Sequence, residues 1–337
     1  MSRTGVEPKL PWRSLPQALR DAVGEALGAP VRRAERVYGG YGPAPTFRLL
    51  LTDGRRAFFK GVGPHDPEFP RHALAREAGY YRELAPLLSG WAPDCLGEVR
   101  LDGWHALLLE DLGPKTVPPW SAAAARGVMQ AFAAFHAATR QHALLQTLPP
   151  PADYAGDFAG CWRRLLDRAE LPRVAMLAGP EAAAAEAWLG EHAATLSRTA
   201  LALAEAPPPY VLLHGDLRSD NLRWRGGRLR RFDWPHLGAG PAEFDVAATA
   251  QSITVEGGPE PERLLGWYGE RTPLRPAVVD AAVAAVAGFF AELAWQPELP
   301  GLPRLRAFQR AQLRVTLRWA AARLGLPEPA WLAAVPV

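Results

Sequence analysis

The run HGDLRSDNL at residues 214–222 combines an acidic residue and an amide at a fixed spacing. Its Asn221 is the only asparagine in the chain of 337 residues. In the pattern HxDxxxxN, the aspartate orients or accepts the proton of an attacking hydroxyl, and the asparagine carbonyl helps to hold a magnesium ion. Magnesium prefers hard oxygen ligands, and an amide supplies one without adding charge. The spacing therefore predicts a phosphotransfer loop, with Asp216 as catalytic base and Asn221 as a metal ligand.

A second acidic residue follows this loop at the end of a predicted hairpin. Residues 222–225 and 229–232 are strand-like segments on either side of Gly226-Gly227, and Asp233 follows them in the triplet FDW. The hairpin returns Asp233 to the loop, so we expect it to be the second metal ligand. Asp220 adds another negative charge beside these ligands. The sequence leaves open whether Asp220 is solvated or helps to bind a second ion.

Lysine is as informative as asparagine here, because only three of the 38 lysines and arginines are lysine: Lys9, Lys60 and Lys115. Lys60 ends the strand-like run RAFFK and is followed by Gly61-Val62. A compact ammonium suits nucleotide phosphates at such a position better than a guanidinium does. We therefore predict that Lys60 binds phosphate, with an ordinary surface lysine as the alternative.

The helix predicted after this strand carries Glu77 in the run REAGYYREL. A carboxylate there can pair with Lys60 and hold it toward the phosphates, as kinases require. Glu83 lies on the same helix and is the rival, and a solvated glutamate is the simpler interpretation of either. We prefer Glu77 because it faces the same way as Leu74 and Tyr81 at helical spacing.

The elements that must position these residues change in character near residue 113. Before it, alternating strands and turns predict an N-terminal antiparallel sheet with one inserted helix, and after it Ala-rich helices predominate. The predicted helices include 15–28, 72–88, 121–141, 158–168 and 180–204, and the predicted strands include 34–38, 46–51, 56–62, 97–101, 104–109 and 210–213. The fold class is therefore α+β and two-lobed. We expect a nucleotide-binding lobe at 1–113, a larger helical lobe with the catalytic loop and acceptor site at 114–337, and a hinge at about 110–114.

A glycine turn separates the first two predicted strands and begins at Gly39 and Gly40. Backbone N–H groups of such a turn can lie over nucleotide phosphates, so we predict that both glycines bind nucleotide. An ordinary hairpin with glycines is the alternative. The turn continues as Tyr41-Gly42-Pro43, and Pro43 has no N–H to donate.

The order of the glycine turn, FFK, REAGYYREL, LLLEDLG, AFHA, HGDLRSDNL, FDWP and GPAEFDVA resembles the aminoglycoside phosphotransferase and choline kinase-like family. The resemblance runs from about residue 34 to residue 250 and more loosely beyond. It implies a protein-kinase-like fold, with ATP and Mg²⁺ as cofactors and a small-molecule hydroxyl as phosphate acceptor. It also implies that Glu110 and Leu112, in the hinge, offer backbone groups to adenine, that Asp245 braces the catalytic loop, and that His136 is buried structure.

Two positions depart from the family pattern. The glycine turn lacks the serine or asparagine that often follows the two glycines, and Asp220 stands where many relatives carry glycine. Neither change removes an essential group, so catalysis remains the main interpretation.

The bulk composition excludes several other classes of protein. A net charge of +3 and the lack of a dense basic run with interleaved aromatics argue against a nucleic-acid partner. Cys95 and Cys161 form no disulfide framework or metal pattern, which predicts reduced thiols in the cytoplasm. The most apolar helical stretch, 281–290, ends near Glu292 and is expected to be too short to span a membrane. The sequence leaves a monomer and a homodimer equally open.

The sequence does not identify the phosphate acceptor. A polycationic aminoglycoside needs acidic residues, and a choline-like cation needs an aromatic cage; an amino sugar, an amino alcohol or another metabolite hydroxyl is equally open. The acidic candidates are Glu243, Glu256, Glu260, Glu262 and Glu270, and the aromatic ones are Trp234, Trp267, Tyr268, Phe289, Phe290 and Trp295. The sequence favours a solvated position for each of these glutamates, and core packing for most of these aromatic rings, over a role in binding.

Two other functions compete with a small-molecule kinase. A nucleotide-binding pseudokinase that acts through partners would lack the lysine, aspartate or asparagine, and all three are present. A protein kinase would carry an activation segment after the metal-binding aspartate. Here FDWP runs within a few residues into GPAEFD, which favours a small-molecule acceptor.

Overall fold

The computed structural model describes residues 9–38, 44–115, 117–149, 158–216, 218–234 and 236–337. The chain forms two compact units. The first unit comprises Met1–Val117, Asp220–His236 and Leu299–Arg304, and the second comprises Pro118–Ser219, Leu237–Glu298 and Leu305–Val337. The expected lobes divide the chain once, whereas these units divide it at several places. The hairpin at 222–232 belongs to the first unit because Arg231 N–H donates to the Trp91 carbonyl (2.8 Å) and Arg230 to the Ala92 carbonyl (2.9 Å).

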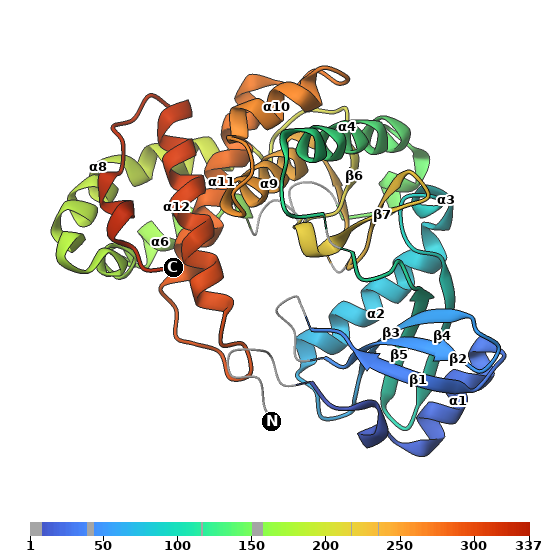
Figure 1. The fold of residues 1–337 in the computed structure, drawn as a ribbon. Coiled ribbons are helices and arrows are strands. Elements are labelled where there is room, and N and C mark those ends of the chain that lie inside the picture. Colours follow the sequence, from blue (N-terminus) through green and yellow to red (C-terminus); the bar gives the residue numbers. More distant parts are fainter. Residues whose placement is uncertain (1–8, 39–43, 116, 150–157, 217, 235) are drawn as a thin grey trace. The chain divides into compact units, whose positions relative to one another are not determined.

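The first unit contains a five-stranded antiparallel sheet with the strand order β1-β2-β3-β5-β4 (Figure 1). Its strands are β1 (Val31–Arg36), β2 (Thr46–Leu51), β3 (Arg56–Val62), β4 (Cys95–Leu101) and β5 (Trp104–Glu110). The predicted strands 46–51 and 56–62 coincide with β2 and β3, whereas β1 begins three residues before the predicted start. The turn between β4 and β5 is formed by Asp102 and Gly103, both with positive φ (47° and 78°), as a two-residue hairpin requires.

Helix α1 (Gln17–Leu27) covers one face of this sheet, beside β1 and β4 (Figure 1). Strand side chains alternate between the two faces, so every second residue of a strand belongs to the core beneath α1. This buried core consists mainly of Leu19, Val23, Leu27, Phe47, Leu49, Leu51, Ala57, Phe59, Val99, Ala106 and Leu108. The residues between them, including Thr46, Arg48, Phe58 and Lys60, belong to the opposite face.

Helices α2 (Glu68–Glu83) and α3 (Ala85–Leu88) replace the single helix predicted at 72–88. The break falls at Leu84, just before Pro86, which has no N–H to continue the hydrogen bonding of α2. Strands β7 (Leu222–Arg225) and β8 (Arg228–Arg231) form the predicted hairpin. Its turn residues Gly226 and Gly227 both have positive φ (57° and 73°).

The second unit is mainly helical (Figure 1). Its helices are α4 (Ala122–Thr139), α6 (Cys161–Asp167), α7 (Leu171–Ala175), α8 (Ala182–Leu201), α9 (Ala242–Val255), α10 (Pro261–Gly269), α11 (Pro276–Ala294) and α12 (Leu305–Arg323). Two short strands, β6 (Val211–Leu213) and β9 (Gly238–Gly240), pair antiparallel. Short 3-10 helices occur along the chain at Trp12–Ser14, Ala143–Thr147, Met176–Glu181, Ser219–Asn221 and Ala330–Ala334.

The expectation that the most apolar stretch is too short to span a membrane is wrong, because this stretch is part of the longer helix α11. The helix has 19 residues, not the ten of the predicted stretch, and by length and composition alone it passes as a candidate span. In this structure, 78% of its most apolar window is buried within the protein. It packs against α6, α8, α9 and α12, as a core helix does. The candidate span is therefore weak evidence for a membrane.

Candidate functional site

A pocket in the first unit brings together most of the predicted site residues. It encloses an empty volume of about 990 Å³, part of which is open to solvent. Lys60, Glu77, Glu110, Leu112, Asn221 and Asp233 all line it. The other lining residues are Lys9, Val37, Tyr38, Ala44, Thr46, Arg48, Phe58, Pro93, Leu109, Asp111, Gly113, Asp220, Arg223 and Phe232. Gly39 and Gly40 lie outside the described residues.

Lys60 lies between two carboxylates at one end of this pocket. Its Nζ is 2.6 Å from Glu77 Oε2 and 2.5 Å from Asp233 Oδ1. Burial disfavours the charged lysine, but attraction to Asp233 and Glu77 outweighs burial and raises the pKa of Lys60. Glu77 is fully buried, whereas the rival Glu83 is exposed. The predicted pair is therefore present, and the ammonium of Lys60 is held charged.

Glu77 also holds the backbone next to Asp233. The Trp234 N–H donates to Glu77 Oε1 (3.2 Å), and the Trp234 indole N–H donates to the Arg231 carbonyl (3.0 Å). Burial raises the pKa of Glu77, and attraction to Lys60 opposes this rise. Asp233 has a φ of 67°, in the left-handed region that aspartate tolerates better than most side chains. The two hydrogen bonds of Trp234 thus fix the backbone beside Asp233 in a conformation that is unfavourable without such contacts.

Asn221 and Asp233 meet the chemical requirements of a magnesium site. Asn221 is buried (3% exposed), and its backbone carbonyl accepts from the Phe232 N–H (3.1 Å), which joins the loop to the residue before Asp233. Magnesium in nucleotide sites is usually bound by one or two protein oxygens together with phosphates and water. Among the described residues, no cluster of three or more His, Cys, Asp or Glu side chains forms a metal site by itself. The donor set therefore fits an ion shared with a nucleotide, and Asp220 lines the same pocket.

The other end of the pocket lies where β5 ends, at Glu110 and Leu112. The Glu110 N–H donates to the Asp94 carbonyl (2.8 Å), so a contact from the Glu110 backbone to a base must come from its carbonyl. Arg48 pairs with Asp111 (3.1 Å), and the Arg223 guanidinium lies 5.1 Å from the centre of the Phe232 ring. We did not assign a role to these charged residues from the sequence. Arginine is so abundant in this chain that an arginine by itself does not indicate a functional role. Only the position of Arg48 could have indicated that it lines the pocket, because it lies two residues after Thr46 and on the same face of β2.

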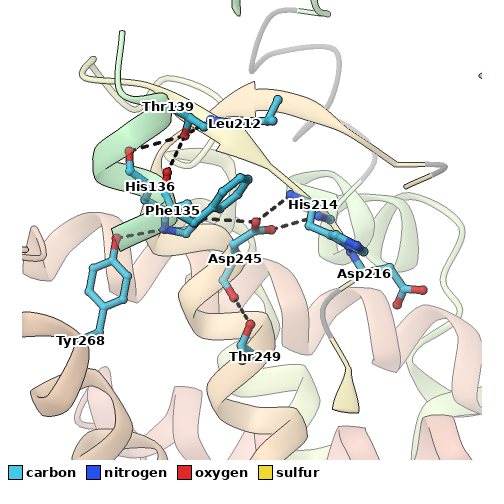
Figure 2. A network of polar contacts seen from close by, with 10 residues as sticks. Phe135, His136, Thr139, Leu212, His214, Asp216, Asp245, Thr249 and Tyr268 are labelled. Atoms are coloured by element: carbon cyan, nitrogen blue, oxygen red, sulfur yellow. Dashed lines mark hydrogen bonds and ion pairs between the residues drawn. The ribbon is translucent and has the colours of Figure 1, made fainter. Parts of the chain in front are cut away.

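Asp216 lies in the second unit, in the loop that follows β6 (Figure 2). The two oxygens of the Asp245 carboxylate accept from the backbone N–H groups of His214 (2.7 Å) and Gly215 (3.0 Å). The Asp216 N–H donates to His214 Nδ1 (3.3 Å). Gly215 has a φ of 77°, which glycine adopts without strain. The loop backbone before Asp216 is thus fixed from α9, as expected from the family resemblance.

A buried polar network extends behind Asp245 (Figure 2). His136 Nε2 lies 3.6 Å from Asp245 Oδ2, and His136 Nδ1 lies 2.9 Å from the Tyr268 hydroxyl. Thr139 Oγ1 accepts from the Leu212 N–H (3.2 Å), which fixes β6 just before the loop. His136 is 1% exposed and has the structural role that the resemblance implies. Helices α4, α9 and α10 therefore support the position of Asp216.

Arg218 was not identified from the sequence as a site residue. Its Nη2 lies 3.4 Å from Asp216 Oδ2, and its guanidinium lies 5.5 Å from the centre of the Phe308 ring of α12. The chain passes from the second unit to the first between Ser219 and Asp220. Asp216 therefore belongs to the second unit, and Asn221 and Asp233 belong to the first.

Most acidic residues considered for an acceptor site have structural partners. Glu243 is bound by Arg275 (2.8 Å), Glu256 accepts from Ser219 (2.6 Å) and Trp120 (2.7 Å), and Glu270 pairs with Arg126 (2.7 Å). Glu262 accepts from Trp319 (2.7 Å) and Arg323 (2.6 Å). Of the aromatic candidates, Trp234 and Tyr268 are fully buried and Phe290 is 7% exposed. These acidic side chains therefore make contacts within the second unit, and the three aromatic rings are part of the core.

Comparisons with known proteins give a consistent picture. The model of the phosphotransferase enzyme family matches residues 33–269, more than two thirds of the chain. No curated protein sequence matches the chain. Several solved structures resemble it in fold.

A spectinomycin phosphotransferase in complex with ADP and spectinomycin is 16% identical, with a TM-score of 0.59 over 92% of this chain and 98% of that one. A thermostable mutant of a second aminoglycoside phosphotransferase, in a ternary complex with ADP and hygromycin B, is 14% identical, with a TM-score of 0.52 over 94% of this chain and 99% of that one. A macrolide 2'-phosphotransferase from Brachybacterium faecium is 19% identical, with a TM-score of 0.50 over 92% and 98%. These similarities confirm the predicted fold class.

Proposed function

Because this chain belongs to the phosphotransferase enzyme family and is a small-molecule kinase, we propose that it transfers the γ-phosphoryl group of ATP, bound with Mg²⁺, to a hydroxyl of a small molecule. The observation that carries this proposal is the ammonium of Lys60 between Glu77 and Asp233, in a pocket that Asn221 also lines. A charged lysine beside hard oxygen donors suits the phosphates of a nucleotide and their metal ion. Two similar solved structures contain ADP, which supports a nucleotide in this pocket.

In this proposal, the first unit binds and orients the nucleotide. Lys60, steadied by Glu77, contacts the phosphates, and the residues where β5 ends contact the base. Asn221 and Asp233 would hold magnesium, which would neutralise charge on the phosphates. Lys60 contacts Oδ1 of Asp233, and a carboxylate has a second oxygen that can bind a metal ion.

The second unit supplies Asp216, which positions the acceptor hydroxyl and takes its proton. Its backbone is held by Asp245 through the N–H groups of His214 and Gly215. A carboxylate that is held in a fixed orientation reduces the loss of entropy on reaching the transition state, which is the main contribution of positioning to catalysis. The acceptor is a small molecule with a free hydroxyl, such as an aminoglycoside, an amino sugar or an amino alcohol.

Nucleotide binding tests this proposal through Asp233→Ala. We expect Mg²⁺ to tighten ATP binding to the wild type, and we expect Asp233→Ala to lose that gain, roughly tenfold or more in Kd. Isothermal titration with ATP, with and without Mg²⁺, measures both quantities. Asp53→Ala is the matched control, because Asp53 lies in a turn of the same unit, pairs with Arg55 and does not line the pocket. An equal gain from Mg²⁺ in the wild type and in Asp233→Ala would refute the assigned metal site.

A further inference from the structure

Two of the three lysines in this chain line the same pocket. Lys60 is the lysine predicted from the sequence, and the second is Lys9, from the segment before α1. Lys9 is 7% exposed, which is unusual for lysine. The third lysine, Lys115, is exposed and is not among the lining residues of the pocket.

The contacts of Lys9 place its ammonium at the Lys60 end of the pocket. Lys9 Nζ donates to Thr46 Oγ1 (2.7 Å). Thr46 is paired directly with Lys60 across β2 and β3, so the two side chains share one face and are neighbours. Arg48, two residues further along β2, pairs instead with Asp111 at the opposite end. Lys9 and Lys60 therefore lie on the same side of the pocket, away from the residues where β5 ends.

The position of Lys9 is fixed by the backbone as well. Its carbonyl accepts from Arg36 Nη1 (3.0 Å), and Thr46 Oγ1 in turn donates to the Val37 carbonyl (3.0 Å). These bonds join the N-terminal segment to β1 and β2. A compact ammonium that lies beside Lys60 in this pocket is suited to bind a phosphate group of a nucleotide.

We propose that Lys9 is a second phosphate-binding cation of the nucleotide site, contributed from outside the segment that the family model matches, residues 33–269. This inference rests on the proposed function. It also agrees with the sequence of the glycine turn, in which Pro43 has no N–H to offer a phosphate.

The test compares nucleotides that differ only in phosphate number. Titration with ATP, ADP, AMP and adenosine in the presence of Mg²⁺ measures Kd for the wild type and for Lys9→Met. We expect Lys9→Met to weaken ATP and ADP binding roughly tenfold or more, because hydrogen bonds to charged groups contribute more than neutral ones. Adenosine binding should change by less than about twofold. Lys9→Arg, which keeps the charge, should retain most of the affinity for ATP.

Two further variants separate phosphate binding from a merely structural role. Lys115→Met removes the exposed lysine and should leave every Kd unchanged. Thr46→Val removes the side-chain acceptor of Lys9. If Lys9 only attached the N-terminal segment to β2, Lys9→Met and Thr46→Val would lower the melting temperature by the same amount, and both would weaken the binding of ATP and of adenosine equally. That result, or ATP binding by Lys9→Met within about twofold of the wild type, would overturn the inference. If the wild type bound no nucleotide, the proposed function would fail first, and this inference with it.

Discussion

Asp245→Asn tests whether the buried carboxylate behind the catalytic loop determines activity. The substitution keeps the size of the side chain but replaces one acceptor oxygen with a donor amide. In the wild type, the two oxygens accept from His214 N–H (2.7 Å) and Gly215 N–H (3.0 Å) (Figure 2). In the variant, one of these N–H groups faces an NH₂ group and loses its acceptor.

The size of the effect follows from these two bonds. A buried N–H without an acceptor costs about 1–3 kcal/mol, and the remaining bond loses about 1 kcal/mol because its acceptor is no longer charged. Removing a buried charge relieves its desolvation cost, which offsets part of this loss. We expect the free energy of unfolding of the second unit to fall by about 2 kcal/mol. A shift of the loop by about 1 Å should lower kcat by about 10²-fold.

The assay must separate these two effects. Steady-state kinetics with MgATP and an accepted substrate give kcat and KM, isothermal titration gives the Kd of MgATP, and urea unfolding gives the stability. The Kd should be unchanged, because the nucleotide pocket is lined by residues of the first unit.

Thr249→Val is the control, because Thr249 Oγ1 donates to the backbone carbonyl of Asp245 (2.7 Å) and not to its carboxylate. The reasoning is wrong if Asp245→Asn loses stability while kcat stays within about threefold of the wild type.

Two other substitutions test the ion pairs of the structure. Glu77→Gln leaves Lys60 with only one of its two carboxylate partners, so MgATP affinity should fall roughly tenfold in titration. Because burial raises the pKa of Glu77, loss of its charge should lower the stability less than removal of a typical buried ion-pair partner does. A large drop in melting temperature would contradict this expectation. Glu243→Gln removes the partner of Arg275 and should lower stability at pH 7 by about 2 kcal/mol, a value reduced because Arg275 is partly exposed. Burial raises the pKa of Glu243, but hydrogen bonds from Arg275 outweigh it and hold the pKa below 4.5. The stabilisation is therefore present above about pH 4.5 and is lost as the pH falls through the lower, folded-state pKa, so urea unfolding from pH 7 to pH 3 should show a smaller loss for Glu243→Gln than for the wild type.

Local sequence patterns predicted β2 and β3 correctly because each strand alternates and the turn between them contains Asp53 and Gly54. The same patterns did not reveal β9, since Gly-Ala-Gly at 238–240 has no strand preference and becomes a strand only by pairing with β6. The helix predicted at 72–88 is interrupted at Leu84, because Pro86 has no N–H with which to continue the hydrogen bonding of α2.

The site shows the same contrast. The pair of Lys60 and Glu77 could be predicted because lysine is rare in this chain and because Glu77 lies on the apolar stripe of its helix. The positive φ of Asp233 and the position of Lys9 against Thr46 depend on tertiary contacts that no local pattern encodes.

The measurement that tests the central claim most directly is acceptor-dependent ADP release from MgATP. The panel comprises aminoglycosides, choline, ethanolamine, amino sugars and other hydroxylated metabolites, with Asp216→Ala as the control variant. We predict that the wild type phosphorylates at least one compound, and that Asp216→Ala binds MgATP as tightly as the wild type but does not turn over. Full turnover by Asp216→Ala, or a wild type that binds no nucleotide, would contradict the account.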